Sequence, residues 1–208
     1  MYLGMSLITK AGIALVGSVG AIGGSYLLYS NISSNYETFK SKIETSQKTL
    51  IKNNEAQWNV KVSLYGKSNN THKITINNQE KNSITKEELS SWCSKQLNQK
   101  YSDESKSLFS TFEKWCLTPD IKEALSKENG TLIPAEDPLN TEWQSQITSK
   151  SAKVQSDLIS ALKLPVENTN TVRPETLRDW CKENIKKEYI SETENNYPLT
   201  KDWCLKAK

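Results

Sequence analysis

The dipeptide Trp-Cys occurs four times in this chain of 208 residues, as two pairs with the same internal spacing. When the sequence is compared with itself, residues 82–118 align without a gap on residues 170–206, at an offset of 88. The identical columns are Asn82/Asn170, Glu87/Glu175, Leu89/Leu177, Trp92/Trp180, Cys93/Cys181, Tyr101/Tyr189, Glu104/Glu192, Trp115/Trp203, Cys116/Cys204 and Leu117/Leu205. Because tryptophan and cysteine are rare residues, this recurrence indicates an internal duplication of one structural unit.

Two further tryptophans, Trp58 and Trp143, precede the aligned segments at an offset of 85, so that each unit has the order Trp, Trp-Cys, Trp-Cys. We predict repeat 1 at 47–118 and repeat 2 at 139–208, with a linker at 119–138 whose three prolines and one glycine are turn and helix-stop signals. Aromatic side chains bury large apolar areas, so we expect the tryptophans to form the core of each repeat, with a ligand-binding aromatic cage as the alternative. The predicted core residues are Trp58, Trp92, Trp115, Trp143, Trp180 and Trp203.

Local signals in each repeat favour helices. Thr85 to Glu88 form a capping box, and apolar residues follow at helical spacing; in repeat 2, Pro174 stands at the first helical position. Around Trp58 the pattern fits a strand or a helix, and the counterpart around Trp143 favours a helix. We predict a polar loop at 67–82 and a helical stalk at 30–46.

The four cysteines allow three disulfide connectivities. The duplication favours Cys93 with Cys116 and Cys181 with Cys204, each closing a loop of about 24 residues that contributes roughly 3 kcal/mol on the chain-entropy model. A four-cysteine zinc site is a weaker alternative, because the sequence has no Cys-x-x-Cys knuckles and the ligands would come from two repeats. Free thiols in a cytosolic protein are the third alternative.

An uncharged apolar segment lies near the N-terminus, at residues 11–29 (AGIALVGSVGAIGGSYLLY). As a helix it would span about 28 Å, close to the thickness of a bilayer core, so we predict a transmembrane signal anchor with a cytoplasmic N-terminus at 1–10. The alternative is a signal peptide cleaved near Gly23. Gly20 and Gly24 form a GxxxG pair on which another membrane helix could pack. Flanking lysines do not decide the orientation, whereas the cysteines favour placing the C-terminal region outside the cell.

The sequence offers no recognisable catalytic centre. The 27 basic and 24 acidic residues are interspersed and give a net charge of +3, so nucleic acid is an unsuitable partner. His72 is the only histidine and lies in the polar segment. Common metalloprotease, hydrolase, nucleotide-binding and calcium-binding motifs are absent from the sequence. We therefore expect no enzyme activity, cofactor, metal or small-molecule substrate, with a hydrolase that uses scattered carboxylates as the remaining enzymatic alternative.

The opening MSLITKAGIALVGSVGAIGG, the lysine- and asparagine-rich composition and the repeated Trp-Cys units together resemble the large paralogous families of uncharacterised membrane and surface proteins in haemotropic mycoplasmas. These bacteria lack a cell wall and live on red blood cells. The resemblance implies a surface location and antigenic variation, and it carries no activity or binding residue over to this chain. No cysteine follows the apolar segment directly, so we expect no lipoprotein anchor.

These observations predict a mainly α protein with an N-terminal transmembrane helix and two tandem disulfide-stapled helical Trp-Cys repeats. Its expected location is the cell membrane, with a single span and an extracellular C-terminal region. The expected function is that of a surface-exposed antigen or protein-interaction module whose partner is unknown. The alternative is a secreted, soluble helical protein released by signal-peptide cleavage.

Overall fold

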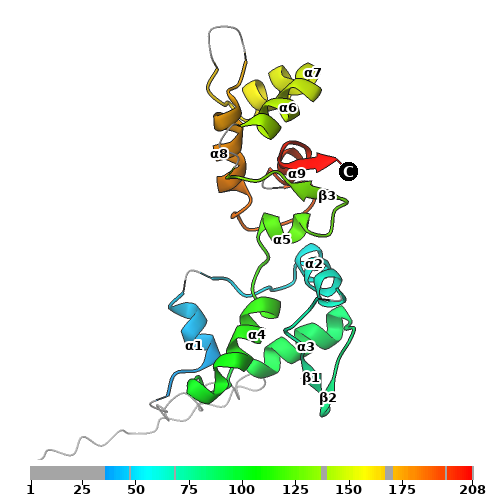
Figure 1. Ribbon diagram of the computed structural model, residues 1–208. Coiled ribbons are helices and arrows are strands. Elements are labelled where there is room, and N and C mark those ends of the chain that lie inside the picture. The colour runs from blue at the N-terminus through cyan, green and yellow to red at the C-terminus, as the bar shows by residue number, and fades with distance from the viewer. Residues whose placement is uncertain are drawn as a thin grey trace, which may run out of the picture. The chain divides into compact units, whose positions relative to one another are not determined.

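The computed structural model describes residues 36–207, except 47, 68, 137–139, 167–170 and 195 (Figure 1). The described residues are mainly helical, as predicted. The predicted membrane segment at 11–29, its Gly20 and Gly24 pair, and the N-terminal residues 1–10 lie outside them. Within the described residues, no helix has the length and apolar character needed to cross a bilayer.

We call residues 36–118 the first half and residues 119–207 the second half. The elements of the first half are α1 (Phe39–Glu44), α2 (Glu55–Tyr65), β1 (Thr75–Ile76), β2 (Gln79–Glu80), α3 (Lys86–Gln96), η1 (Asp103–Ser105) and α4 (Lys106–Cys116). Those of the second half are α5 (Ile121–Leu125), β3 (Gly130–Leu132), α6 (Thr141–Ser149), α7 (Ser151–Lys153), η2 (Val154–Ala161), α8 (Pro174–Asn184), α9 (Tyr197–Cys204) and β4 (Leu205–Ala207).

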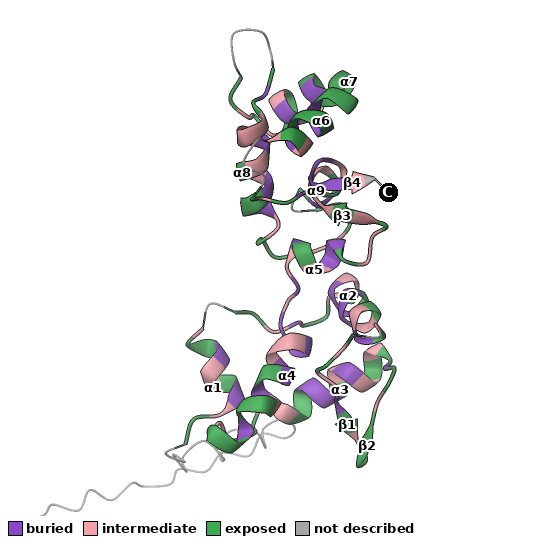
Figure 2. Cartoon of the chain, in the orientation of Figure 1, coloured by how far each residue is buried: buried purple, intermediate pink, exposed green. Residues whose placement is uncertain are grey.

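In the first half, α3 and α4 form a helical pair joined by a disulfide between Cys93 and Cys116. The predicted capping box starts α3: the Thr85 hydroxyl accepts the Glu88 N–H, and the Glu88 carboxylate accepts the Thr85 N–H. Apolar sides of these helices meet beneath α2 in one buried cluster (Figure 2). Its aromatic members are Phe39, Trp58, Tyr65, Trp92, Phe109, Phe112 and Trp115.

The segment around Trp58 is helix α2, in agreement with the prediction made from its counterpart in the second half. The Asn54 side chain caps this helix by accepting the Gln57 N–H, which satisfies one of the free N–H groups of the first turn. Strand-like alternation in the sequence is therefore overridden by the cap and by burial on more than one side of the helix.

The second half contains a corresponding pair, α8 and α9, joined by a disulfide between Cys181 and Cys204. Pro174 is the first residue of α8, where its fixed φ suits a helix start and its missing N–H leaves no bond unmade. Both disulfides span a sequence separation of 23 residues. The buried cluster beneath this pair contains Trp143, Ile147, Leu158, Leu177 and Trp203 among others.

The segment 67–82 is more ordered than the loop predicted there. Strands β1 and β2 form a short hairpin, and Asn77 and Asn78 between them both have positive φ, at 52° and 60°. A two-residue hairpin turn of this kind favours asparagine, which tolerates left-handed backbone better than most residues. Tyr65 holds the hairpin on α2, because its hydroxyl accepts the Ile74 N–H and donates to the Lys81 carbonyl.

The segment predicted as a helical stalk, 30–46, also differs from the prediction, because its helix α1 belongs to the core of the first half. Phe39 and Ile43 of α1 are buried in the first cluster. The backbone N–H of Phe39 donates to the Gln99 carbonyl at 3.0 Å, which fixes the start of α1 beside the loop after α3. A freely projecting stalk would leave both apolar side chains in water.

The predicted linker at 119–138 is likewise folded into the second half. Its helix α5 starts with a backbone bond from Ile121 to the Lys187 carbonyl at 2.9 Å, and Lys187 aligns with Gln99 of the first half. Strand β3 pairs antiparallel with β4, with Leu132 opposite Leu205. Helices α1 and α5 thus make the same backbone bond to aligned residues in their respective halves.

A third buried cluster joins the two halves. Val60 on the outer side of α2 packs with Ile121 and Leu125 of α5 and with Tyr189 and Tyr197. All of these side chains are at most 1% exposed. A hydrogen bond also joins the two halves next to this cluster, because the Gln57 amide donates to the Tyr189 carbonyl at 2.7 Å. The halves therefore share a core and are not independent modules on a flexible tether.

Candidate functional site

The recurrence of contacts in the two halves separates structural roles from functional ones. A residue whose contact recurs at the aligned position holds the fold, whereas a feature found in one half only is a candidate for function.

The first tryptophan of each half makes an equivalent hydrogen bond. The Trp58 indole donates to the Lys52 carbonyl at 2.9 Å, and the Trp143 indole donates to the Pro134 carbonyl at 3.1 Å. The preceding residues also make equivalent bonds: the Ile51 N–H donates to the Cys116 carbonyl, and the Ile133 N–H donates to the Cys204 carbonyl, both at 3.0 Å. These indoles bind their own backbone and are unavailable for a ligand-binding cage.

The last tryptophans also have partners at corresponding positions, a backbone carbonyl in the first half and a side-chain carboxylate in the second. The Trp115 indole donates to the His72 carbonyl at 2.6 Å, and the Trp203 indole donates to the Asp157 carboxylate at 3.1 Å. His72 and Asp157 are 85 residues apart, the same offset that separates Trp58 from Trp143. The only histidine of the chain therefore contributes its backbone to the core of the first half.

Five of the six predicted core tryptophans are buried, and Trp180 is only partly buried against the second cluster. Its counterpart Trp92 lies deeper, near Phe112, at 6.5 Å between ring centroids. The sequence pattern therefore identifies the tryptophans that line the cores but does not distinguish their depths.

A charged cluster at the junction of the halves was not predicted from the sequence. The Lys61 side chain is buried on α2, and its ammonium group donates to the Glu123 carboxylate and to the Lys114 carbonyl, both at 2.9 Å. The Lys114 ammonium reaches the other Glu123 oxygen at 2.8 Å. These residues line a cleft of about 540 Å³ together with His72 and Asp120.

The cluster has perturbed titration properties. Burial lowers the pKa of the Lys61 ammonium even though Glu123 opposes this effect. Burial alone would raise the pKa of the Glu123 carboxyl, but Lys61 and Lys114 hold it below its usual value. Burial raises the pKa of Asp120, which caps α5 by accepting the Glu123 N–H at 2.7 Å. Shifted pKa values in a cleft are a common sign of an active site, but structural ion-pair networks also produce them.

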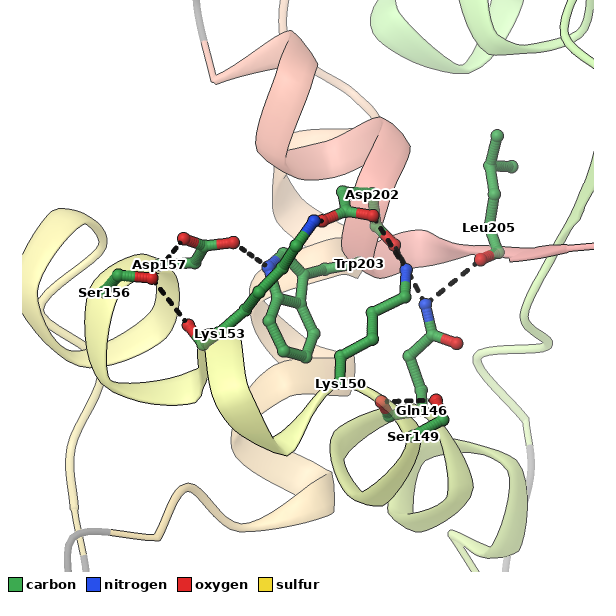
Figure 3. A network of polar contacts seen from close by, with 9 residues as sticks. All are labelled: Gln146, Ser149, Lys150, Lys153, Ser156, Asp157, Asp202, Trp203 and Leu205. Carbon is green, nitrogen blue, oxygen red and sulfur yellow. Dashed lines mark hydrogen bonds and ion pairs between the residues drawn. The ribbon is translucent and has the colours of Figure 1, made fainter.

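The second half supplies that explanation (Figure 3). Gln146, which lies at the offset of 85 from Lys61, donates its amide to the Asp202 carbonyl at 2.9 Å, and Asp202 aligns with Lys114. Lys150 and Lys153 form ion pairs with the Asp202 carboxylate at 2.9 and 2.8 Å. The neutral Gln146 amide thus makes the same hydrogen bond as the Lys61 ammonium group, to the backbone carbonyl of the residue that precedes the second Trp-Cys of its half. The hydrogen bond that Lys61 donates therefore has a structural counterpart in the second half.

Each half also has a groove beside its disulfide, and aligned residues form the floors of the two grooves. In the first half the floor consists of Leu50, Ile51, Trp58, Leu97, Cys93 and Cys116. The aligned residues of the second half line the second groove, namely Leu132, Ile133, Trp143, Ile185, Cys181 and Cys204. The first groove has a volume of about 740 Å³ and the second about 280 Å³.

Comparison with protein-family models, with curated proteins and with solved structures finds no match. Among the described residues, no group of histidine, cysteine and acidic side chains is arranged to hold a metal ion. All four cysteines are in disulfides. The two grooves beside the disulfides differ in volume, and we regard the larger groove of the first half as the candidate functional site.

Proposed function

We propose that this chain is a membrane-anchored, surface-exposed, non-enzymatic protein that acts as an antigen or a protein-interaction module. The observation that carries the proposal is the pair of buried disulfides, each closed within one half. Disulfides persist in oxidising compartments and are rare in the cytosol, so they favour an extracytoplasmic location for the described residues. The uncharged segment at 11–29 supplies a means of anchoring.

The scaffold of this module consists, in our proposal, of two copies of one disulfide-stapled Trp-Cys unit. Support comes from contacts that recur in both halves. These are the backbone bond at the start of α1 and of α5, the indole hydrogen bonds of Trp58 and Trp143, and the indole hydrogen bonds of Trp115 and Trp203. Each unit is larger than the sequence alignment indicated, because it includes the short helix at its start. Such a frame keeps its exposed polar residues in fixed positions while leaving them free to vary.

The interaction role is favoured over catalysis by the contacts of the charged cluster. The Lys61 and Lys114 ammonium groups share the Glu123 carboxylate, and the Lys61 pair holds α5 on α2. A general base needs a free lone pair directed at a substrate, and this arrangement uses the lysine donors internally.

Labelling of intact cells with a membrane-impermeant, amine-reactive biotin reagent tests the location. Cells that produce the full chain should give biotinylated protein, because lysines are distributed along both halves. A cytoplasmic protein in the same cells serves as the control and should label only after lysis. Labelling of this chain only after lysis would contradict the proposal.

The same sample distinguishes an anchored protein from a secreted one, for which the small residues at 21–23 provide a candidate cleavage site. Retention in the membrane fraction with residues 11–29 still attached is expected. A mature N-terminus near Gly23, found by mass spectrometry of protein in the medium, would instead establish the secreted alternative.

A further inference from the structure

The surface at which the chain enters the described residues has a counterpart inside the molecule. An antiparallel bridge pairs Thr38 with Lys100 beside α1, and the bridge at the aligned positions beside α5 pairs Asp120 with Glu188. The residue after each bridge takes part in a T-shaped pair of aromatic rings, Tyr101 with Phe109 and Tyr189 with Tyr197. We call segments 36–44 and 100–101 the α1 face, and the aligned segments 118–126 and 188–189 the α5 face.

The α5 face is buried against the first half. Val60 of α2 packs there with Ala124 and Tyr189, which are 0% and 1% exposed. On the α1 face, in contrast, Tyr101 is only partly buried and Tyr36 is 47% exposed. A surface that receives a partner in one half is therefore open to water in the other.

Three positions give the α1 face a different chemistry from the α5 face. Tyrosine and two lysines replace a threonine, an alanine and a glutamate, in the pairs Tyr36/Thr118, Lys42/Ala124 and Lys100/Glu188. Each lysine lies over a tyrosine ring of the same face: the ammonium of Lys42 is 4.8 Å from the ring centroid of Tyr101, and that of Lys100 is 5.8 Å from the centroid of Tyr36. Tyrosine is enriched where proteins meet lipid headgroups, and lysine can lay its apolar stem on such a boundary while its charge stays in water.

The α1 face does not depend on an excess of charge. Lysines and acidic residues are equal in number in the face and the turn that follows it, residues 36–44 and 100–106. Lys42 is paired with Glu37 at 3.4 Å, and Lys40 with Glu44 at 4.0 Å. The Lys100 ammonium has no carboxylate partner among the described residues and is held only against the Tyr36 ring. Its donors are therefore available to a phosphate oxygen.

The sequence keeps this face close to the membrane if residues 11–29 form the anchor. The uncharged segment ends at Tyr29, and Tyr36 already belongs to the α1 face. The chain between these two residues can extend over about 25 Å at most, which is less than the thickness of a bilayer core. A face attached at this distance meets lipid at a high effective concentration, so weak contacts suffice to hold it there.

We propose that the α1 face docks on the phospholipid headgroups of the membrane that holds residues 11–29. The rings of Tyr36 and Tyr101 lie at headgroup depth, and the Lys100 ammonium binds a lipid phosphate. This proposal rests on the proposed membrane anchor and gives the described region a second contact with the same membrane. The α5 face makes no such contact, because α2 covers it.

Cross-linking to a phosphatidylcholine that carries a diazirine on its headgroup tests the docking, with the full chain in nanodiscs. Mass spectrometry after irradiation should find lipid adducts on the α1 face and none on the α5 face. Adducts at residues 30–35 report separately that the anchor is inserted. Adducts at 30–35 without any on the α1 face would overturn the docking and leave the anchor intact, whereas adducts in neither place would overturn both.

The decisive variant combines Tyr36→Thr, Lys42→Ala and Lys100→Glu, which gives the α1 face the residues of the α5 face. The yield of adducts on the α1 face should fall at least fivefold, while the yield at residues 30–35 stays the same. An unchanged yield on the α1 face would contradict the docking. The variant should keep the Cys93–Cys116 disulfide and its thermal unfolding temperature, because the second half carries these residues at equivalent positions.

A single substitution keeps the test valid if the triple variant unfolds. Lys100→Glu changes one exposed side chain and should lower the yield of adducts on the α1 face at least twofold. Its matched control, Lys182→Glu, makes the same change of charge on an exposed residue of α8 and should leave that yield unchanged. Equal effects of the two substitutions would show a general response to charge and overturn the assigned phosphate contact.

Discussion

Replacement of Trp115 by alanine should lower the free energy of unfolding by about 3–5 kcal/mol, the usual cost of deleting a large buried aromatic side chain. The Trp115 side chain is 1% exposed, and its ring lies 5.0 Å from that of Tyr65. Its indole also satisfies the His72 carbonyl at 2.6 Å, and loss of the donor leaves that carbonyl unpaired in the core. The cavity and the lost hydrogen bond act in the same direction.

The matched control is Trp180→Ala, which removes a tryptophan that is only partly buried. We expect a cost of about 1 kcal/mol, near the centre of the distribution for point substitutions. Urea unfolding followed by far-ultraviolet circular dichroism gives both values without relying on tryptophan fluorescence. Equal losses for Trp115→Ala and Trp180→Ala would contradict the assignment of Trp115 to the core and Trp180 to its edge.

Replacement of Glu123 by glutamine should cost about 3–5 kcal/mol, because removal of one partner leaves a buried charge uncompensated. Lys61, whose side chain is 2% exposed, would lose its carboxylate while remaining beside Lys114. Combination with Lys61→Gln should recover most of the loss, since Gln146 makes the equivalent bond in the second half without a charge. Failure of the second substitution to rescue the first would contradict the structural role of Lys61.

The pH dependence of unfolding provides an independent check on the same pair. The pKa of Glu123 in the folded state lies below its ordinary value of 4.5. The folded state therefore binds fewer protons than the unfolded state in this range, and the contribution of the pair is present above about pH 4.5 and lost as the pH falls further. Chemical unfolding at several pH values should show this loss in the wild type, and a smaller loss in the Lys61→Gln, Glu123→Gln double variant.

The helical pairs and their disulfides could be predicted from the sequence because their signals are local or use rare residues. The capping box at Thr85 lies within four residues, and Pro174 marks a helix start by itself. Spacing of Cys93 to Cys116 matches that of Cys181 to Cys204, so a duplicated unit favours pairing within each half.

The short helices could not be predicted because their signals are weak and out of register with the rest. Phe39 and Ile121 start α1 and α5 at an offset of 82, whereas the Trp-Cys segments have an offset of 88. Helices of five or six residues are too short to show a helical repeat of apolar residues. Pro119 also indicated a linker, although its carbonyl accepts the Tyr189 N–H at 2.8 Å.

The charged cluster and the groove depend on contacts between distant parts of the chain. Lys61 resembles a solvated lysine until Glu123, 62 residues later, is brought beside it. Ser90 and Ser94 are unremarkable helix residues until their counterparts Arg178 and Lys182 are seen to line an equivalent groove. Only the three-dimensional comparison of the halves makes these positions informative.

Peptide mapping of the four cysteines, without reduction and with free thiols blocked during isolation from producing cells, tests the central claim most directly. Lysines between the two cysteines of each pair allow trypsin to separate all four as distinct peptides. The account predicts Cys93 linked to Cys116, Cys181 linked to Cys204, and no thiol available for alkylation before reduction. Alkylated cysteines in the isolated protein, or a link such as Cys93 to Cys181, would contradict both the self-closed halves and the placement outside the cell.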